Sequence, residues 1–248
     1  MKLLAPATSL LLPRFTAAFR NDLRLQFRHG FYYVYLVLAI LYVIILRVLP
    51  DSARDLLLPL VIFTDPAIAG FYFIGAIVLL ERADGTQQAL FITPLRVRDY
   101  LLSKVMSLTT LAVATSMAIA LFAIGPTFNI LALFIGSTLT SVLFVSLGLA
   151  FVSRFKVLNI YLFSAGLAVA MLSLPLLGFL NIFDSVLLWL FPTQPCLVVI
   201  AMAFRPEVYP LWERILSLVL LLAWIAGAWL WASRWYPRYV LEWTEVKR

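Results

Sequence analysis

The chain has 248 residues, of which 64% are hydrophobic and only 12% are charged. Soluble proteins have about half apolar and about a quarter charged residues, so this composition predicts an integral membrane protein. The net charge is +7, but the cations lie beside long apolar runs, which favours anionic lipid headgroups over nucleic acid as their partners. With one histidine, His29, and one cysteine, Cys196, the sequence offers no metal-ligand cluster and no disulfide pair.

Residues 13–29 are predicted to form an amphipathic helix on the membrane surface. Apolar side chains recur at every fourth position of this segment, namely Phe15, Phe19, Leu23 and Phe27. A neighbouring row consists of the cations Arg20, Arg24 and Arg28. An apolar row edged by arginines suits an interfacial helix whose guanidinium groups bind lipid phosphates, so these arginines are predicted membrane-surface anchors. A merely solvated segment before the first span is the alternative.

Six apolar segments then follow, each long enough to cross a hydrocarbon core of about 30 Å as a helix. They are predicted at 31–49, 66–82, 105–124, 130–152, 157–180 and 211–233. The second is preceded by Thr64-Asp65-Pro66, which predicts Asp65 as an N-cap and Pro66 as the first helical residue. Alternatively, the Asp65 carboxylate serves an ion site within the membrane.

The fourth span carries small residues at helical spacing, which let helix backbones approach closely. These residues are Gly136, Ser137, Thr140, Ser141 and Gly148. In the fifth span, Pro175 and Gly178 predict a kink near the far end.

Between the fifth and sixth spans, residues 184–204 contain two apolar stretches separated by Pro192-Thr193-Gln194-Pro195. Each stretch is too short to span a bilayer, which favours a pair of short helices that dip into the outer leaflet. The predicted fold class is therefore an all-α integral membrane protein with six transmembrane helices, an N-terminal amphipathic interfacial helix and a re-entrant helical pair before the sixth span.

The distribution of lysine and arginine orients these spans. With the N-terminus inside, fifteen of the nineteen cations fall on the inner side. Because inner loops carry the excess of cations, both termini and the loop 83–104 are predicted to be cytoplasmic.

The sequence lacks the residues that several classes of function require. Acids and the single histidine are too scattered for an enzyme site, and no segment fits the phosphate-binding pattern G-x-x-x-x-G-K-[ST]. The spans also lack the midplane carboxylates or histidines typical of ion-coupled carriers. If the chain transports actively, the energy must come from another subunit through a cytoplasmic loop, and the chain itself is not expected to be an enzyme.

The loop 83–104 and its flanks provide the most specific signal. Glu81-Arg82, Gly85-Thr86, Thr93-Pro94 and Lys104 together resemble the E-R-x-x-G-T…[ST]-P…K pattern between the second and third spans of ABC transporter type-2 permeases. The amino-acid sequences of segments 79–82 and 94–104 are most similar to those of permeases for fluoroquinolone or multidrug export. Gln87-Gln88 and Ser103 depart from the family pattern, which bears on the subfamily more than on the family.

This resemblance implies a short coupling helix at 86–92, gripped by a separate ATPase subunit that binds ATP and Mg²⁺. Gly85 suits a sharp exit from the second span, and Thr93 with Pro94 suits the start of the next helix. The expected ATPase-coupling residues are Arg82, Gly85, Thr86, Gln87, Gln88, Thr93, Pro94, Arg96 and Arg98. For each arginine, a role in lipid contact or topology is the alternative.

Glu81 and Lys104 are candidates for an ion pair that locks a closed state; the alternative for Glu81 is a solvated helix end. The resemblance thus implies a permease subunit of an ATP-driven exporter in a prokaryotic plasma (inner) membrane. With a second permease copy or a paralogue, it would form a pathway for a small amphipathic compound such as a drug or antibiotic. The main alternative is a regulatory or structural membrane protein that docks a cytoplasmic partner through its basic loop. A lipid-modifying enzyme is a more distant alternative.

Overall fold

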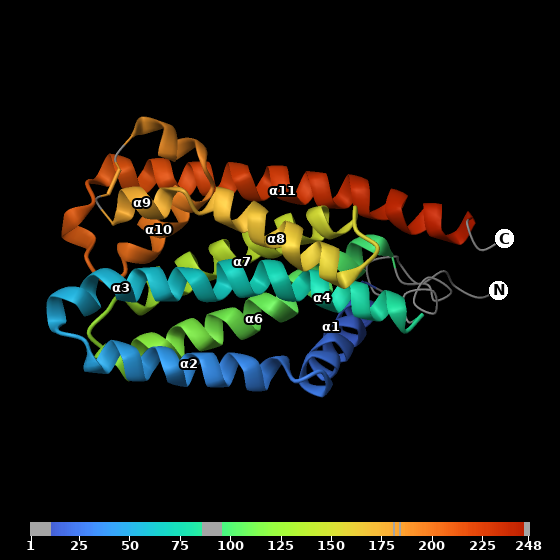
Figure 1. Cartoon of the computed structure of the whole chain (residues 1–248), viewed down its shortest axis with the longest axis horizontal. Coiled ribbons are helices and arrows are strands. Elements are labelled where there is room, and N and C mark those ends of the chain that lie inside the picture. The colour runs from blue at the N-terminus through green and yellow to red at the C-terminus, as the bar shows by residue number, and fades with distance from the viewer. Residues whose placement is uncertain (1–10, 86–95, 181, 184, 246–248) are drawn as a thin grey trace, which may run out of the picture.

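A computed structural model describes residues 11–85, 96–180, 182–183 and 185–245 of the chain. Within these ranges the secondary structure is helical, with no strand, and the long helices form an elongated bundle (Figure 1). The helix α1, the C-terminal end of α4 and the last turns of α11 lie at the same end of this bundle. The helical elements are α1 (Leu11–Arg28), α2 (Phe31–Val48), α3 (Asp51–Thr64), η2 (Asp65–Ala69), α4 (Gly70–Ala83), α6 (Val97–Ile124), α7 (Ile130–Val152), α8 (Leu158–Leu172), α9 (Pro175–Phe179), η3 (Val186–Leu190), α10 (Thr193–Ala201), η4 (Pro206–Val208) and α11 (Leu211–Glu245).

Among the residues that the structure describes, five helical segments are long and apolar enough to cross a membrane. They are Phe31–Val48, Asp51–Ala83, Val97–Ile124, Ile130–Val152 and Leu211–Pro237. The helix α8 is apolar but has only 15 residues, fewer than the roughly 20 that a bilayer requires. The structure therefore supports five of the six predicted spans by length and composition, and in the region of the other, 157–180, the helix breaks before Pro175, near the predicted kink.

The predicted start of the second span was wrong. Asp65 does not cap a new helix, because its backbone is helical (φ −62°, ψ −60°) and α3, η2 and α4 run on without a break. The segment η2 is a π-helix with Pro66 near its start, and the wider π turn accommodates a residue that lacks an N–H donor. The helix begins at Asp51, directly after the extended residue Pro50, and an acidic residue in the first turn suits the positive end of a helix.

Three other boundaries differ from the sequence prediction. The loop expected at 83–104 ends earlier, since α6 begins at Val97 with the extended residue Arg96 as its N-cap. The predicted helix start at Thr93 and Pro94 lies outside the described residues. In the stretch 184–204, η3 and α10 are two short helices, but α10 already begins at Thr193 and includes Pro195. The last helix continues beyond 233 to Glu245.

The core of the bundle is built around α7, which packs against α11, α6, α4 and α10. Its small residues allow this, as the sequence predicted. A Cβ on Gly148 would lie 2.4 Å from Ile74 Cγ2, and one on Gly136 would lie 3.1 Å from the carbonyl oxygen of Val199. Ser137 and Thr140 are fully buried on the same helix. Close backbone packing of this kind is the usual source of helix association in membranes.

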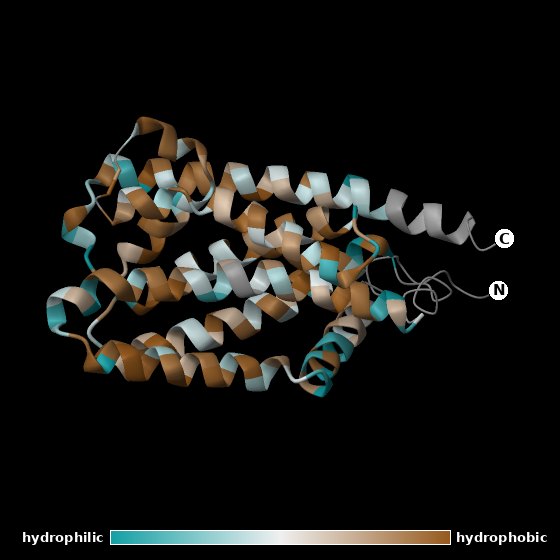
Figure 2. Cartoon of the chain, viewed as in Figure 1, coloured by the Kyte–Doolittle hydropathy of each residue, from teal (hydrophilic) through white to brown (hydrophobic). Residues whose placement is uncertain are grey.

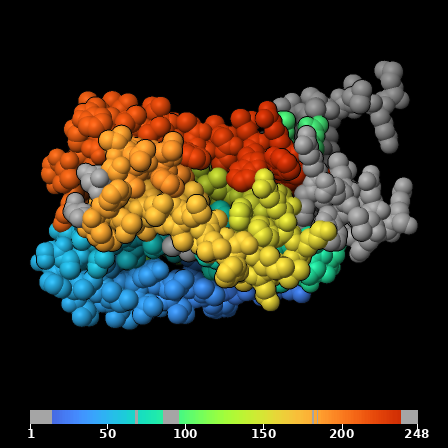
Figure 3. Space-filling view, turned by 45° about the horizontal axis from the view of Figure 1, so that its top comes forward, coloured from blue at the N-terminus to red at the C-terminus, as the bar shows by residue number. Residues whose placement is uncertain are grey.

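The outer helices expose apolar side chains. Large hydrophobic residues are exposed along α2, α8 and α11, and hydrophilic residues gather on α1 and on the connections at the two ends (Figure 2). On the face shown in Figure 3, the α8–α9 segment lies over the middle of the molecule, between α11 and the α2–α3 segment. Apolar exterior surface of this extent suits contact with lipid or with another membrane subunit.

Candidate functional site

Three charged side chains meet at the end of the bundle where α1, α4 and α6 converge. Lys104 of α6 is only 1% exposed and forms ion pairs with Glu81 of α4 and Asp22 of α1; its Nζ lies 2.5 Å from Asp22 Oδ1. Asp22 and Glu81 are buried as well. We call Asp22, Glu81 and Lys104 the charge cluster.

Hydroxyl groups extend the charge cluster to a fourth helix. The Tyr100 hydroxyl donates a hydrogen bond of 2.7 Å to Glu81 Oε2, and the hydroxyls of Tyr236 on α11 and Tyr100 lie 3.2 Å apart. The two tyrosine rings stack with their centroids 5.6 Å apart. On the other side, the Ser103 hydroxyl donates to Asp22. The network thus joins α1, α4, α6 and α11 at one end of the bundle.

The electrostatics of the charge cluster make it a strong structural constraint. Two carboxylates face one ammonium group, and buried charges are tolerated only when ion pairs and hydrogen bonds compensate for their lost hydration. Here Tyr100 and Ser103 each provide a further donor to one carboxylate. Movement of α1, α4 or α6 relative to the other two must therefore break or exchange a charged contact.

The face of α1 that packs on α6 is polar. Besides Asp22, Gln26 is buried there, and its Nε2 donates a hydrogen bond of 2.8 Å to Ser107 Oγ. The predicted anchors Arg20, Arg24 and Arg28 are all exposed on α1. Sequence reasoning missed Asp22 and Gln26. The available signal was a pair of uncharged or acidic polar residues four positions apart in an otherwise cationic helix.

The structure describes four of the expected coupling residues. Arg82 Nη1 donates a hydrogen bond of 3.2 Å to the carbonyl of Phe155, in the turn between α7 and α8. Gly85 has a φ of 70°, in the left-handed region that glycine favours, and the chain leaves α4 there. Arg96 and Arg98 are exposed at the start of α6. Thr86, Gln87, Gln88, Thr93 and Pro94, and with them the expected coupling helix, lie outside the described residues.

A second buried carboxyl group lies inside the bundle. Asp65 of η2 is buried and accepts a hydrogen bond from the Thr115 hydroxyl of α6. Across the described ranges, no three His, Cys, Asp or Glu side chains gather in a way that could hold a metal ion. The contacts observed are ion pairs and hydrogen bonds at the charge cluster and a hydrogen bond at Asp65.

Apolar helices of spanning length, packed around α7 and tied together at one end by buried ion pairs, define a multi-pass helical membrane protein. The chain belongs to the fluoroquinolones export permease protein family, whose model matches residues 13–244. It is therefore a membrane permease of the exporter type, from a family of transport proteins rather than enzymes, and the resemblance seen in the sequence is confirmed.

Two curated relatives are similar over nearly their whole length. Both are fluoroquinolones export permease proteins of Mycobacterium tuberculosis, from strains CDC 1551 / Oshkosh and ATCC 25618 / H37Rv. Each is 27% identical to this chain over 232 residues, which cover 93% of the chain and 98% of the relative. The similarity therefore includes both the charge cluster and the opposite end of the bundle.

Proposed function

We propose that this chain is the membrane-spanning permease subunit of an ATP-driven ABC exporter in a prokaryotic plasma membrane. It forms half of a pathway for a small amphipathic compound such as a drug or antibiotic. The observation that carries the proposal is the match of residues 13–244 to a family of export permeases. The sequence has no G-x-x-x-x-G-K-[ST] loop, so ATP and Mg²⁺ would bind to a separate ATPase subunit.

The position of the charge cluster supports coupling to such a subunit. Glu81 lies near the end of α4, and Lys104 lies in the second turn of α6, so the cluster flanks the connection that the family resemblance assigns to ATPase contact. A displacement of this connection would move α4 and α6 together. Because the cluster also includes Asp22 of α1, and Tyr100 with Tyr236 extends it to α11, the displacement would pass to these helices as a rigid-body motion. Breakage of the Glu81–Lys104 pair is the step by which the helix ends would separate.

The remaining features of the proposal rest on charge and on surface chemistry. Most cations lie on the segments predicted to face inward, so we assign both termini and the charge cluster to the cytoplasmic side. The segments α8 and α9 together provide the fifth of six crossings, and η3 with α10 dips into the outer leaflet. The exposed apolar faces of α2 and α11 contact lipid and a second permease copy or a paralogue.

Affinity purification from the native host in mild detergent tests the partner. We expect an ATPase with a phosphate-binding loop to co-purify with the wild-type chain. The variants Arg96→Glu and Arg98→Glu reverse exposed charges at the start of α6 and should recover less ATPase. Arg54→Glu, at the opposite end of the bundle, is the matched control and should recover as much as wild type. A chain that emerges without any ATPase would favour the alternative of a regulatory or structural protein.

A further inference from the structure

A groove of about 460 Å³ runs between α2 and α6, which lie side by side in the bundle (Figure 1). We call it the α2–α6 groove. Apart from Arg47 at one end, the side chains that line it are aliphatic or aromatic. Its volume falls within the roughly 300–1,000 Å³ typical of small-molecule sites. The groove therefore has the size of a ligand site, with an apolar body and one charged end.

The cross-section of the α2–α6 groove suits a hydrocarbon chain. The small side chain of Ala39 and the fully buried Ile119 form its floor. Leu36, Ile44 and Phe122, each more than half exposed, form its rims. A chain laid in the groove would contact apolar side chains below it and on both sides, and many such contacts together give substantial dispersion energy.

The length of the groove matches one leaflet of a bilayer. From Leu36 to Arg47, α2 rises about 16 Å at 1.5 Å per residue. This is close to half of a hydrocarbon core of about 30 Å. Arg47 lies in the last turn of α2, where the headgroups of that leaflet would begin.

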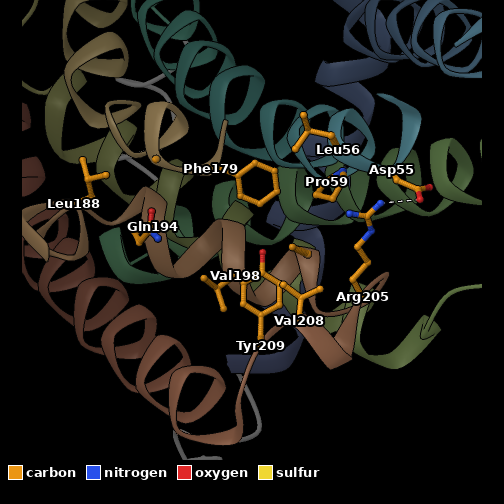
Figure 4. Close-up of a pocket in the computed structure, with 12 residues that line it drawn as sticks. Asp55, Leu56, Pro59, Phe179, Leu188, Gln194, Val198, Arg205, Val208 and Tyr209 are labelled. Carbon is orange, nitrogen blue, oxygen red and sulfur yellow. Dashed lines mark ion pairs between the residues drawn. The ribbon is translucent and has the colours of Figure 1, made fainter. Parts of the chain in front are cut away.

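Arg47 differs from the other cations at its end of the bundle. Four arginines lie at the end opposite the charge cluster, namely Arg47, Arg54, Arg205 and Arg214. Arg54 and Arg205 each pair with an aspartate, and Arg214 donates to two backbone carbonyls. Figure 4 shows the Arg205–Asp55 pair, beside a pocket at this end. Arg47 has no acidic partner among the residues that the structure describes.

A single hydrogen bond fixes the Arg47 guanidinium at the end of the groove. Its Nε donates a bond of 2.8 Å to the Phe122 carbonyl. That carbonyl needs a donor from outside α6, because the residue four positions on is Pro126, which has no N–H. Within the described part of the chain, the two terminal nitrogens of Arg47 have no protein acceptor. Their N–H groups form a fork of the kind that binds two oxygens of a phosphate.

We propose that the α2–α6 groove binds one acyl chain of an anionic phospholipid, whose phosphate pairs with Arg47. The chain lies along the floor from Arg47 to Leu36. A net negative headgroup is favoured over a zwitterionic one, because the lining has one cation and no acid that could pair with an ammonium group. This lipid extends the packing of α2, the least buried of the five spans in the described residues. It is a resident of the protein and not the transported compound.

Photolabelling of the full-length chain in phosphatidylcholine nanodiscs tests the proposal. The probe is phosphatidylglycerol with a diazirine on one acyl chain, at low mole fraction, and peptide mapping locates its adducts. We expect a higher yield on segments 36–44 and 118–122 than around Phe163 and Leu167 of α8, whose exposed side chains report ordinary lipid contact. A groove yield no higher than that of α8 would overturn the proposal.

Competition separates this lipid from other occupants. Excess unlabelled phosphatidylglycerol should displace the probe from the groove, and the fluoroquinolone norfloxacin should not. Displacement by norfloxacin but not by the unlabelled lipid would assign the groove to an exported compound. Groove segments that stay unlabelled in a dimer, and become labelled when the dimer dissociates, would assign it to a second copy of the chain. Either of these results would overturn the lipid site.

Matched variants test the two ends of the argument. Arg47→Gln removes the phosphate partner and should lower the groove yield about fivefold, whereas Arg47→Lys keeps the charge and should lower it less. Arg54→Gln removes a cation at the same end but outside the lining, and should leave the yield unchanged. Ala118→Leu fills the groove and should also lower the yield, whereas Ala226→Leu, at an exposed position of α11, should not. A yield that neither Arg47→Gln nor Ala118→Leu lowers would contradict a specific site.

Discussion

Lys104 of α6 and Asp22 of α1 form an ion pair, with Nζ 2.5 Å from Oδ1, in a place where both side chains are almost fully buried. The two residues are 82 positions apart in the chain. Together with Glu81 they fix α1 to the end of the bundle at which α4 ends and α6 begins.

The first prediction concerns the ammonium group at the centre of the charge cluster. Lys104→Met would leave two buried carboxylates without their cation, and we expect it to lower the free energy of unfolding by about 3–5 kcal/mol. The triple variant Asp22→Asn, Glu81→Gln, Lys104→Met removes all three charges and should recover most of this loss. Equilibrium unfolding in mixed micelles measures both. A single variant as stable as wild type would contradict the buried ion pairs.

The second prediction ranks two tyrosines of the same network. Tyr100→Phe removes a donor to the Glu81 carboxylate and should cost about 1.5–3 kcal/mol, the usual range for a hydrogen bond to a charged group. Tyr236→Phe removes only a longer contact between two neutral hydroxyls and should cost about 1 kcal/mol or less. The same unfolding assay gives the order of the two effects, and the reverse order would be inconsistent with the described geometry.

The third prediction tests the close packing of α4 against α8. A Cβ on Gly75 would lie 2.0 Å from the ring of Tyr161, whose hydroxyl donates a 2.7 Å hydrogen bond to the Phe71 carbonyl. Because this ring cannot move without loss of that bond, Gly75→Ala should destabilise the chain by about 1–3 kcal/mol or more. Gly227→Ala on α11 is the matched control, since nothing lies within 4 Å of its Cβ position. It should stabilise the helix by about 0.5–1 kcal/mol. Equal effects in thermal unfolding would contradict the packing.

The fourth prediction concerns Asp65, whose buried carboxyl group accepts a hydrogen bond from Thr115. Thr115→Val removes the donor and should lower stability by about 1–3 kcal/mol, because it leaves a buried polar group without this partner. Asp65→Asn keeps an acceptor oxygen for the Thr115 hydroxyl and should be less harmful. Thermal unfolding of the two variants compares them, and a larger loss for Asp65→Asn would point to a need for the carboxylate itself.

Apolar length and small-residue spacing were enough to predict most of the bundle, because both act locally along one helix. The bounds of α7 and its close-packed glycines, Gly136 and Gly148, follow directly from them. Asp65 misled the prediction because Asp-Pro is a typical helix start, whereas here tertiary packing and a π turn carry the helix through it. The sequence does not display that packing.

The candidate site was predicted in part. The family pattern singled out Glu81 and Lys104, and the structure places them in contact. Asp22 could not be paired with them from sequence, because the contact is long-range and α1 was expected to lie on lipid rather than to bury a polar face against α6. The hydroxyls of Tyr100 and Tyr236 were missed for a similar reason: aromatic residues near span ends are usually interfacial belts.

The most direct test of the central claim is drug transport by the chain and its co-purified ATPase in proteoliposomes. The account predicts norfloxacin movement across the membrane that requires ATP and Mg²⁺ and stops when either subunit is omitted. If both subunits are present and ATP is hydrolysed, but the drug crosses no faster than in protein-free liposomes, the assignment of this chain as a drug-export permease is contradicted.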